Sequence, residues 1–347
     1  MSRFFSEHGG DIYANSGITL DFSVNTNPLG MPEAVKRAIV EHMPDYERYP
    51  DFACRALRAA LAERHGVEPS MIRCGNGASE LILALCACVK PRQTLVLAPT
   101  FSEYARSARL FGGQVRTHRL SEKNGFALTQ SILAALTPET DLLFLCNPNN
   151  PTGQLTDRAL LRQIADTCRG NKTLLLLDEC FVGFTRGESM VPLLAEYPNL
   201  LVLQAFTKMY AMAGLRLGML FGADKALLTR IAAFCPAWNV SGVAQAAGLA
   251  ALSAGDWIEA TQKLVENERA FMAGALGKLG IAVGKSDANF LLLRSEKPLF
   301  APLRERGILV RSCANFPGLS GCYTRIGLKT RDENTALLRA LSEVVNG

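Results

Sequence analysis

The sequence lacks the charge pattern of a nucleic-acid-binding protein and the long apolar segment of a membrane protein. Its 37 Lys and Arg exceed its 32 Asp and Glu by only five charges, and no block of like charge concentrates this excess. Nucleic acid is therefore not an expected partner. The longest apolar run, residues 81–89, is far shorter than the ~20 residues that span a bilayer, so no membrane association is expected.

Cysteine and histidine are present without the spacings that make disulfide scaffolds or metal sites. The ten cysteines include no Cys-x-x-Cys pair, and Cys86 and Cys88 are too close for an ordinary bridge or zinc site. The four histidines show no ligand spacing either. The N-terminus turns polar after two Phe and so does not resemble an export signal. We expect reduced, mostly buried thiols, no metal, and a soluble cytoplasmic protein.

What the sequence does have is a regular alternation of short apolar segments and amphipathic helical segments between residues 71 and 222. This alternation is typical of a mainly parallel sheet flanked by helices. Because helices cover both faces of such a sheet, each strand should be apolar almost throughout. The seven expected strands are residues 71–74, 94–98, 115–119, 141–146, 173–177, 200–204 and 219–221.

Helices are expected where apolar side chains recur every three or four residues. Gly66 should end the second helix, Thr156 should cap the fourth, and Gly112 should follow the third. The expected helices are residues 32–42, 52–65, 103–111, 159–168, 243–279, 299–306 and from 332 onward. Beyond residue 240 they accompany an apolar segment at 289–294 and strands at 308–311 and 323–328, which indicates a smaller α+β domain.

The length of 347 residues favours about two domains. We expect an α/β protein with a mainly parallel seven-stranded sheet and a smaller α+β domain. Residues 1–45 should join the small domain, residues 46–240 should form the large domain, and residues 241–347 should form the small domain. The cleft between the two domains is the expected site.

Three polar segments should reach that cleft from the carboxyl ends of strands, where open α/β sheets bind ligands. Asp178 ends an apolar strand, although such an Asp is also common as a cap or turn residue. Lys208 stands between apolar residues, where desolvation would lower its pKa and favour Schiff-base chemistry; the alternative is a solvated surface lysine. The segment N-P-N-N-P-T-G at residues 147–153 either forms a tight turn or directs Asn150 into the cleft.

In this order and spacing, N-P-N-N-P-T-G, D-E-C-F from Asp178, and T-K with Arg216 following resemble fold type I pyridoxal-phosphate enzymes of the class I and II aminotransferase superfamily. The resemblance covers nearly the whole chain. It implies that Lys208 binds the cofactor covalently and that Asp178 keeps the pyridine nitrogen protonated, so that the ring can accept electrons. It also implies that Asn150 donates a hydrogen bond to the phenolic oxygen.

The turn G-N-G-A-S-E at residues 75–80 follows a strand and opens a helix, so its N–H groups can face an anion. In the resembled enzymes this turn helps to hold the cofactor phosphate. Phe101 corresponds to the aromatic residue that stacks on the cofactor ring, with a core Phe as the alternative. The residues that correspond to the phosphate ligands are Ala78, Ser79, Thr207 and Arg216.

Within the superfamily, three segments are more similar to threonine-phosphate decarboxylases than to histidinol-phosphate aminotransferases. They are the start from H-G-G-D, the lysine segment T-K-M-Y-A-M-A-G-L-R-L-G, and I-L-V-R-S-C-A-N-F-P-G-L near the end. Phe181 also replaces a Tyr that donates to the phenolic oxygen in the aminotransferases. Two departures, Gly183 and the short segment 11–20, affect the expected shape of the substrate pocket.

The resemblance implies that Arg325 binds the substrate carboxylate. A guanidinium suits a carboxylate or a phosphate, so two arginines fit an amino acid phosphate. Surface or strand-edge cations are the alternative for these arginines, and a solvated residue near the terminus is the alternative for His8. The residues implied around the substrate are His8, Gly9, Asn25, Asn150, Arg311 and Arg325.

The implied activity is decarboxylation of O-phospho-L-threonine, or of O-phospho-L-serine, giving aminopropanol phosphate for cobalamin from the threonine substrate. A histidinol-phosphate aminotransferase is the alternative, with the same cofactor residues but a broken Cα–H bond. A DNA-binding regulator is not expected, because no added basic segment is present. Tyr49, in Y-E-R-Y-P-D, corresponds to a residue that reaches the neighbouring subunit's cofactor phosphate and implies a homodimer; alternatively it packs in its own loop.

Overall fold

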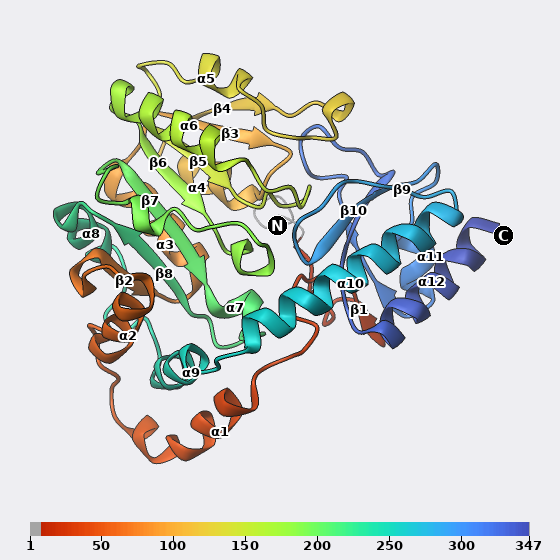
Figure 1. The fold of residues 1–347 in the computed structure, drawn as a ribbon, viewed down its shortest axis with the longest axis horizontal. Coiled ribbons are helices and arrows are strands. Elements are labelled where there is room, and N and C mark those ends of the chain that lie inside the picture. The colour runs from red at the N-terminus through yellow and green to blue at the C-terminus, as the bar shows by residue number, and fades with distance from the viewer. Residues whose placement is uncertain (1–7, 347) are drawn as a thin grey trace.

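A seven-stranded sheet forms the core of the part on the left of Figure 1 in the computed structural model, which describes residues 8–346. Its strand order is β2-β8-β7-β6-β5-β3-β4. Strand β8 is antiparallel to both neighbours and the other pairs are parallel, so the predicted mainly parallel seven-stranded sheet is confirmed. The strands are β2 (Ile72–Gly75), β3 (Gln93–Ala98), β4 (Gln114–Arg119), β5 (Leu142–Cys146), β6 (Leu174–Asp178), β7 (Leu200–Ala205) and β8 (Gly218–Gly222).

Strand β5 shows why the central strands are apolar along their whole length. Leu143 and Leu145 enter one hydrophobic cluster, whereas Leu142 and Phe144 enter a second cluster on the other face. Successive side chains of a strand point to opposite faces, so a sheet covered on both faces needs apolar residues at every position. Strand β4 contradicts this expectation: it is mostly exposed and polar, because it lies at the edge and pairs only with β3.

Helices pack on both faces of this sheet. The end of α2 and the start of α6 show whether the predicted stop and cap residues are correct. Gly66, with a φ of 64°, ends α2 as predicted. The predicted cap of α6 is wrong, because Asp157 accepts hydrogen bonds from Ala159 N at 2.8 Å and Leu160 N at 3.4 Å, whereas Thr156 lies one residue before it. The helices here are α2 (Arg55–His65), α3 (Gly77–Val89), α4 (Ser102–Leu110), α5 (Ser131–Ala135), α6 (Arg158–Asn171), α7 (Phe206–Met209) and α8 (Lys225–Ala232).

The single helical stretch predicted over residues 243–279 is also wrong. Helix α9 (Gly242–Leu252) and helix α10 (Trp257–Lys278) are separate, and the chain between them has the sequence Ser-Ala-Gly-Asp. Ser, Gly and Asp favour turns over helix interiors, which explains the break. No helix in the described residues is both long enough and apolar enough to cross a membrane.

A four-stranded antiparallel sheet lies beside α10 on the right of Figure 1. The predicted strand at 308–311 is two strands in different sheets, and its first part, β11, pairs in parallel with β1 near the N-terminus. This pairing attaches the N-terminal segment to the C-terminal part, while the domain boundaries at 45 and 240 stay predictions. The elements are β1 (Leu20–Asp21), α1 (Glu33–Glu41), β9 (Ala282–Val283), β10 (Phe290–Arg294), α11 (Phe300–Glu305), β11 (Ile308–Leu309), β12 (Arg311–Ser312), β13 (Tyr323–Gly327) and α12 (Arg331–Asn346).

All ten cysteines are free thiols, as expected from their spacing. Five are buried and five are half-buried, so the expectation of mostly buried thiols is met only in part. Over residues 8–346, no group of three or more His, Cys, Asp or Glu is arranged to hold a metal ion.

Candidate active site

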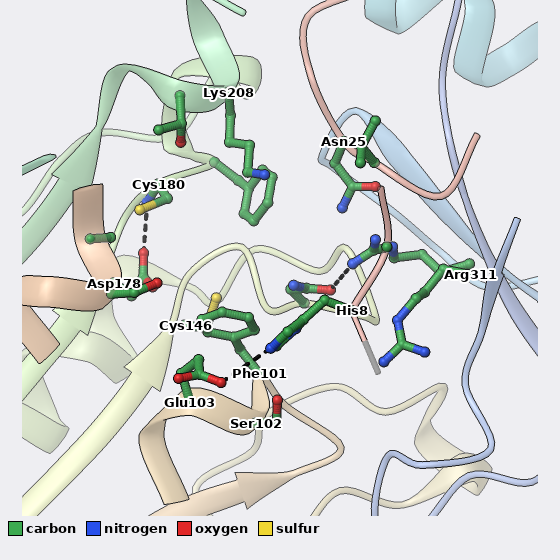
Figure 2. Close-up of a pocket in the computed structure, with 18 of the residues that line it drawn as sticks. His8, Asn25, Phe101, Ser102, Glu103, Cys146, Asp178, Cys180, Lys208 and Arg311 are labelled. Carbon is green, nitrogen blue, oxygen red and sulfur yellow. Dashed lines mark hydrogen bonds and ion pairs between the residues drawn. The ribbon is translucent and has the colours of Figure 1, made fainter. Parts of the chain in front are cut away.

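A cavity of about 550 Å³ lies between the carboxyl ends of the central strands and the C-terminal antiparallel sheet (Figure 2). Both parts of the chain supply its walls, which is where the sequence predicts the site. Every predicted site residue except Tyr49 lines it. They are His8, Gly9, Asn25, Ala78, Ser79, Phe101, Asn150, Asp178, Thr207, Lys208, Arg216, Arg311 and Arg325.

Lys208 lies in the short helix α7, directly after strand β7, and its side chain projects into the cavity. Burial lowers the pKa of its amine to about 8, and the nearby Arg325 cation adds to this effect. A lysine with a pKa near 8 is about one-tenth unprotonated at pH 7, far more than an ordinary lysine, and the unprotonated amine is the form that attacks a carbonyl. Lys208 is therefore not the solvated surface lysine of the alternative interpretation.

Asp178 ends strand β6 at the floor of the cavity and is almost fully buried. Its carboxylate accepts hydrogen bonds from the Tyr104 hydroxyl at 2.6 Å and from the Cys180 backbone N–H at 2.9 Å. Burial nevertheless raises the pKa of Asp178, against the effect of these hydrogen bonds and of Lys208. A cationic N–H group bound beside this carboxylate would offset that desolvation.

The turn before α3 forms a cradle for an anion. Gly77 begins this 13-residue helix with a φ of +78°, which favours glycine. A Cβ at Gly77 would lie 2.5 Å from Arg216 Nη2, and a Cβ at Gly218 would lie 2.6 Å from the carbonyl carbon of Gly77. Both positions need glycine, so the helix N-terminus closely approaches β8 and Arg216, beside Thr207. Helix N–H groups next to a guanidinium and a hydroxyl suit a phosphate.

Two arginines form the opposite wall. Arg325 on β13 is 6% exposed and donates from Nη1 to Asn150 Oδ1 and from Nη2 to the Ser23 carbonyl, both at 2.6 Å. Burial lowers the pKa of Arg325 to about 10, and the positive charge of Arg311 contributes to the same direction. Among the described residues, no carboxylate lies within ion-pair distance of Arg325. An anionic ligand would therefore compensate a buried cation.

Arg311 lies directly opposite Arg325 in the pairing of β12 with β13. It is buried too, donates from Nη2 to Asn315 Oδ1 at 2.9 Å, and packs 5.0 Å from the centre of the Phe316 ring. Like charges opposite each other on paired strands are unfavourable without an anion between or beside them. Neither arginine is the exposed surface cation of the alternative interpretation.

Two site residues that follow Phe101 in the first turn of α4 were not predicted from the sequence. Tyr104 is fully buried and holds Asp178, and Glu103 brings a carboxylate into the cavity beside His8 (Figure 2). The available signal was their position, because the first turn of a helix that follows a strand faces the carboxyl edge of the sheet. Their partners are distant in sequence, so the residues alone do not identify them.

Two residues singled out from the sequence lie outside the cavity. Tyr49 is 79% exposed and stacks on Trp238, with ring centres 4.5 Å apart. Gly183 contributes to the packing behind the site, where its carbonyl accepts a hydrogen bond from Gln262 at 2.9 Å. The departure at Gly183 therefore does not shape the cavity wall. Phe181 does line the cavity.

Comparison with known proteins gives matches over the full chain. The family model for aminotransferase class I and II matches residues 18–341. The threonine-phosphate decarboxylase of Salmonella typhimurium is 42% identical over 359 residues, covering 100% of this chain and 99% of that protein. An adenosylcobalamin biosynthesis bifunctional protein of Leptospira interrogans is 30% identical, covering 98% of this chain and 41% of that protein.

A solved structure has the same architecture. The histidinol-phosphate aminotransferase from Clostridium acetobutylicum superposes with a TM-score of 0.89 at 30% identity, covering 94% of this chain and 99% of that one. The family model and the full-length relative agree with the resemblance carried by the lysine, aspartate and asparagine segments. The chain therefore belongs to the class I and II aminotransferase family and has its fold type I architecture.

Proposed function

We propose that this protein is a pyridoxal-phosphate-dependent decarboxylase of O-phospho-L-threonine, and that it yields aminopropanol phosphate for cobalamin biosynthesis. The observation that carries the proposal is the buried pair Arg311 and Arg325, which faces Lys208 across one cavity. Two guanidinium groups suit a substrate with a carboxylate and a phosphate. The names of the Salmonella and Leptospira relatives support this substrate and this pathway.

The residues present fit pyridoxal phosphate. Asp178 has a desolvated carboxylate that needs a cationic partner, and the glycine-lined turn before α3 leaves room for a phosphate. Asn25 Oδ1 is buried with no hydrogen-bond partner among the described residues, as a ligand-facing atom would be. When bound, the cofactor supplies a conjugated ring that withdraws electrons from the substrate Cα. The proposed phosphate ligands are Ala78, Ser79, Thr207 and Arg216, and Phe101 is proposed to stack on the ring.

The catalytic side chains then have separate tasks. Lys208 would hold the cofactor through its amine and, once that amine is free, would return a proton to the substrate Cα. Asp178 keeps a proton on the ring nitrogen, and Asn150 donates from Nδ2 to the phenolic oxygen. Arg325 orients the substrate carboxylate so that the bond to be broken is the one between Cα and the carboxylate. Decarboxylation follows from that orientation, whereas an aminotransferase must present the Cα–H bond.

The exposed aromatic residues near Tyr49 support a homodimer. Tyr49 and Trp238 stack on each other, and Phe52 and Trp238 line one neighbouring hollow; all three are about half exposed or more. Exposed aromatic clusters of this kind are typical of interaction surfaces. A second copy of the chain would cover them and bring Tyr49 to the cofactor phosphate of its partner. The ten free thiols support the cytoplasm as the compartment.

Product analysis tests the proposed reaction. The holoenzyme is incubated with O-phospho-L-threonine, then with O-phospho-L-serine, and carbon dioxide is measured. A parallel reaction contains histidinol phosphate and 2-oxoglutarate, and glutamate is measured. Carbon dioxide release from a phosphorylated amino acid is the expected result. Rapid glutamate formation without carbon dioxide would instead establish the histidinol-phosphate aminotransferase, which the match to the Clostridium structure favours as the second candidate.

Borohydride reduction tests the role of Lys208. The wild-type holoenzyme should be yellow, should bleach on reduction, and should then carry cofactor mass on the peptide that contains Lys208. Lys208→Ala should carry none. Covalent cofactor on the reduced Lys208→Ala protein would assign the covalent bond to another lysine.

A further inference from the structure

Glu103 is the unexpected side chain in this cavity. Its carboxylate lines a site proposed to bind a substrate with two anionic ends, and its side chain is only 11% exposed. A carboxylate in such a place repels the ligand unless nearby cations compensate it. Glu103 lies in the first turn of α4, two residues after Phe101, the N-cap residue proposed to stack on the cofactor ring.

His8 and Arg106 approach the two oxygens of Glu103. His8 Nε2 lies 3.2 Å from Oε1, and Arg106 Nη1 donates to Oε2 at 2.8 Å. The hydrogen bond with His8 is the main reason that the pKa of Glu103 is lowered against the opposing effect of burial. Figure 2 shows the His8 imidazole directed at the Glu103 carboxylate, with a dashed line for the contact between them.

His8 belongs to a short segment, residues 8–10, which we call the N-terminal strap. Its other end is fixed on the arginine wall: Gly10 N–H donates to Ser23 Oγ at 2.7 Å. A Cβ at Gly9 would lie 2.1 Å from the Ser23 carbonyl oxygen, so the strap packs directly on that backbone. The same carbonyl accepts from Arg325. The strap thus runs from the wall that holds Arg325 to Glu103 on α4.

We propose that Glu103 is a positioning residue, which through its contact with His8 holds the N-terminal strap across the cavity and sets His8 in place to contact the substrate. His8 is exposed, with 47% of its side-chain surface accessible, so the orientation of its ring depends on directional contacts such as the one with Glu103. Phe101 contacts that ring loosely, with ring centres 5.9 Å apart and planes tilted by 49°. The carboxylate supplies the directional contact that a weak ring contact does not.

This inference rests on the proposed function only for the identity of the substrate. A merely structural Glu103 would support the first turn of α4, and its loss would destabilise the fold without a specific effect through His8. If Glu103 is a positioning residue, the effects of changing Glu103 and His8 should overlap in the double variant, because both changes weaken the same contact. The two possibilities therefore differ in a double-mutant cycle.

The experiment compares kcat and KM of four holoenzymes with O-phospho-L-threonine: wild type, Glu103→Gln, His8→Gln and the double variant. Glu103→Gln is expected to raise KM by about threefold to tenfold and to change kcat by less than about twofold, because a partly exposed charged hydrogen bond is lost. The double variant should be no worse than the poorer single variant. Glu196→Gln, which removes a carboxylate from the surface pair with Arg162 at 3.0 Å, is the matched control and should leave KM unchanged.

Three results would overturn the inference: an unchanged KM in Glu103→Gln, a loss confined to kcat, or effects of the two single variants that multiply in the double variant. Should Glu103→Gln fail to fold, Glu103→Asp provides a second cycle, because it keeps the charge but shortens the reach to His8. A wild-type enzyme that transaminates histidinol phosphate and releases no carbon dioxide would refute the proposed function alone. The same cycle is then measured with histidinol phosphate.

Discussion

Replacing Arg325 with Met removes the guanidinium that we assign to the substrate carboxylate while keeping an unbranched side chain of similar length. In the structure two of its five N–H groups are engaged, one with Asn150 Oδ1 and one with the Ser23 carbonyl. Its Nε is buried with no hydrogen-bond partner among the described residues. Donors are therefore left for a ligand, and their loss should reduce catalysis more than stability.

The expected magnitudes follow from these contacts. A charge-assisted hydrogen bond is worth about 1.5–3 kcal/mol, so loss of a two-pronged grip should lower kcat/KM by roughly 10²-fold to 10⁴-fold. For the fold, two opposing effects nearly cancel. The lowered pKa of about 10 means that holding the buried cation below that pH costs roughly 3 kcal/mol, which the variant recovers. The two acceptors left unpaired cost about 1–3 kcal/mol each.

The assay measures both quantities on one preparation. Thermal unfolding of the cofactor-free protein should shift by only a few degrees, while carbon dioxide release from O-phospho-L-threonine should fall by at least about a hundredfold. Any remaining turnover should contain a larger share of transamination, since the carboxylate is no longer oriented. A variant that unfolds far below the wild type but, when folded, keeps the wild-type kcat/KM would refute the argument and make Arg325 a structural residue.

Three further changes test other parts of the site. In the cofactor-free protein, the depressed pKa of Lys208 makes protonation cost stability below about pH 8, and this cost disappears as pH rises toward the ordinary pKa of 10.5. Lys208→Met should therefore be about 1–3 kcal/mol more stable than wild type at pH 7, as measured by thermal unfolding. This difference in stability should vanish near pH 10.5. A difference that stays constant with pH would contradict the assigned cause. Gly218→Ala places a Cβ 2.6 Å from the backbone of Gly77 and should weaken cofactor binding by about tenfold or more in a spectral titration. The control Gly214→Ala, with no atom within 4 Å of its Cβ, should leave cofactor binding unchanged. Tyr49→Ala should lower cofactor retention in a dimer seen by sedimentation, and a stable, active wild-type monomer would exclude that role.

Local patterns predicted most of the fold because they depend on neighbouring residues. The Leu-rich strands β5, β6 and β7 follow from burial on both faces, and the end of α2 follows from the left-handed conformation of Gly66. The break between α9 and α10 was missed because it is only four residues long and apolar residues occur directly before and after it, although Ser253, Gly255 and Asp256 favour a turn. The pairing of β1 with β11 was missed because each strand has only two residues. Two residues are too few to produce a periodic signal.

In the site, as in the fold, single residues were predicted from local patterns, whereas contacts between distant residues were not. Lys208, Asp178 and Asn150 were predicted because each lies at or just after the end of a strand and belongs to a recognisable segment. The contact between His8 and Glu103 joins residues 95 positions apart, and neither residue has a local pattern that requires it. Side-chain pairs across a cavity depend on how two separately folded walls meet. A single sequence contains no direct signal of which side chains will face each other across the cavity.

Phe181, which replaces the Tyr of the aminotransferases, packs against the aromatic ring that lies beside Arg325. Its ring packs edge-on against Phe290 at 5.0 Å, and the Arg325 guanidinium lies 5.6 Å from the centre of the Phe290 ring. Phe181 thus supports the ring that lies beneath the Arg325 guanidinium. Asn150 then becomes the shared residue: its Oδ1 accepts from Arg325, which leaves Nδ2 as the atom that can donate to the cofactor. The residue proposed to grip the substrate carboxylate therefore also orients the proposed donor to the cofactor, so movement of either one changes the other.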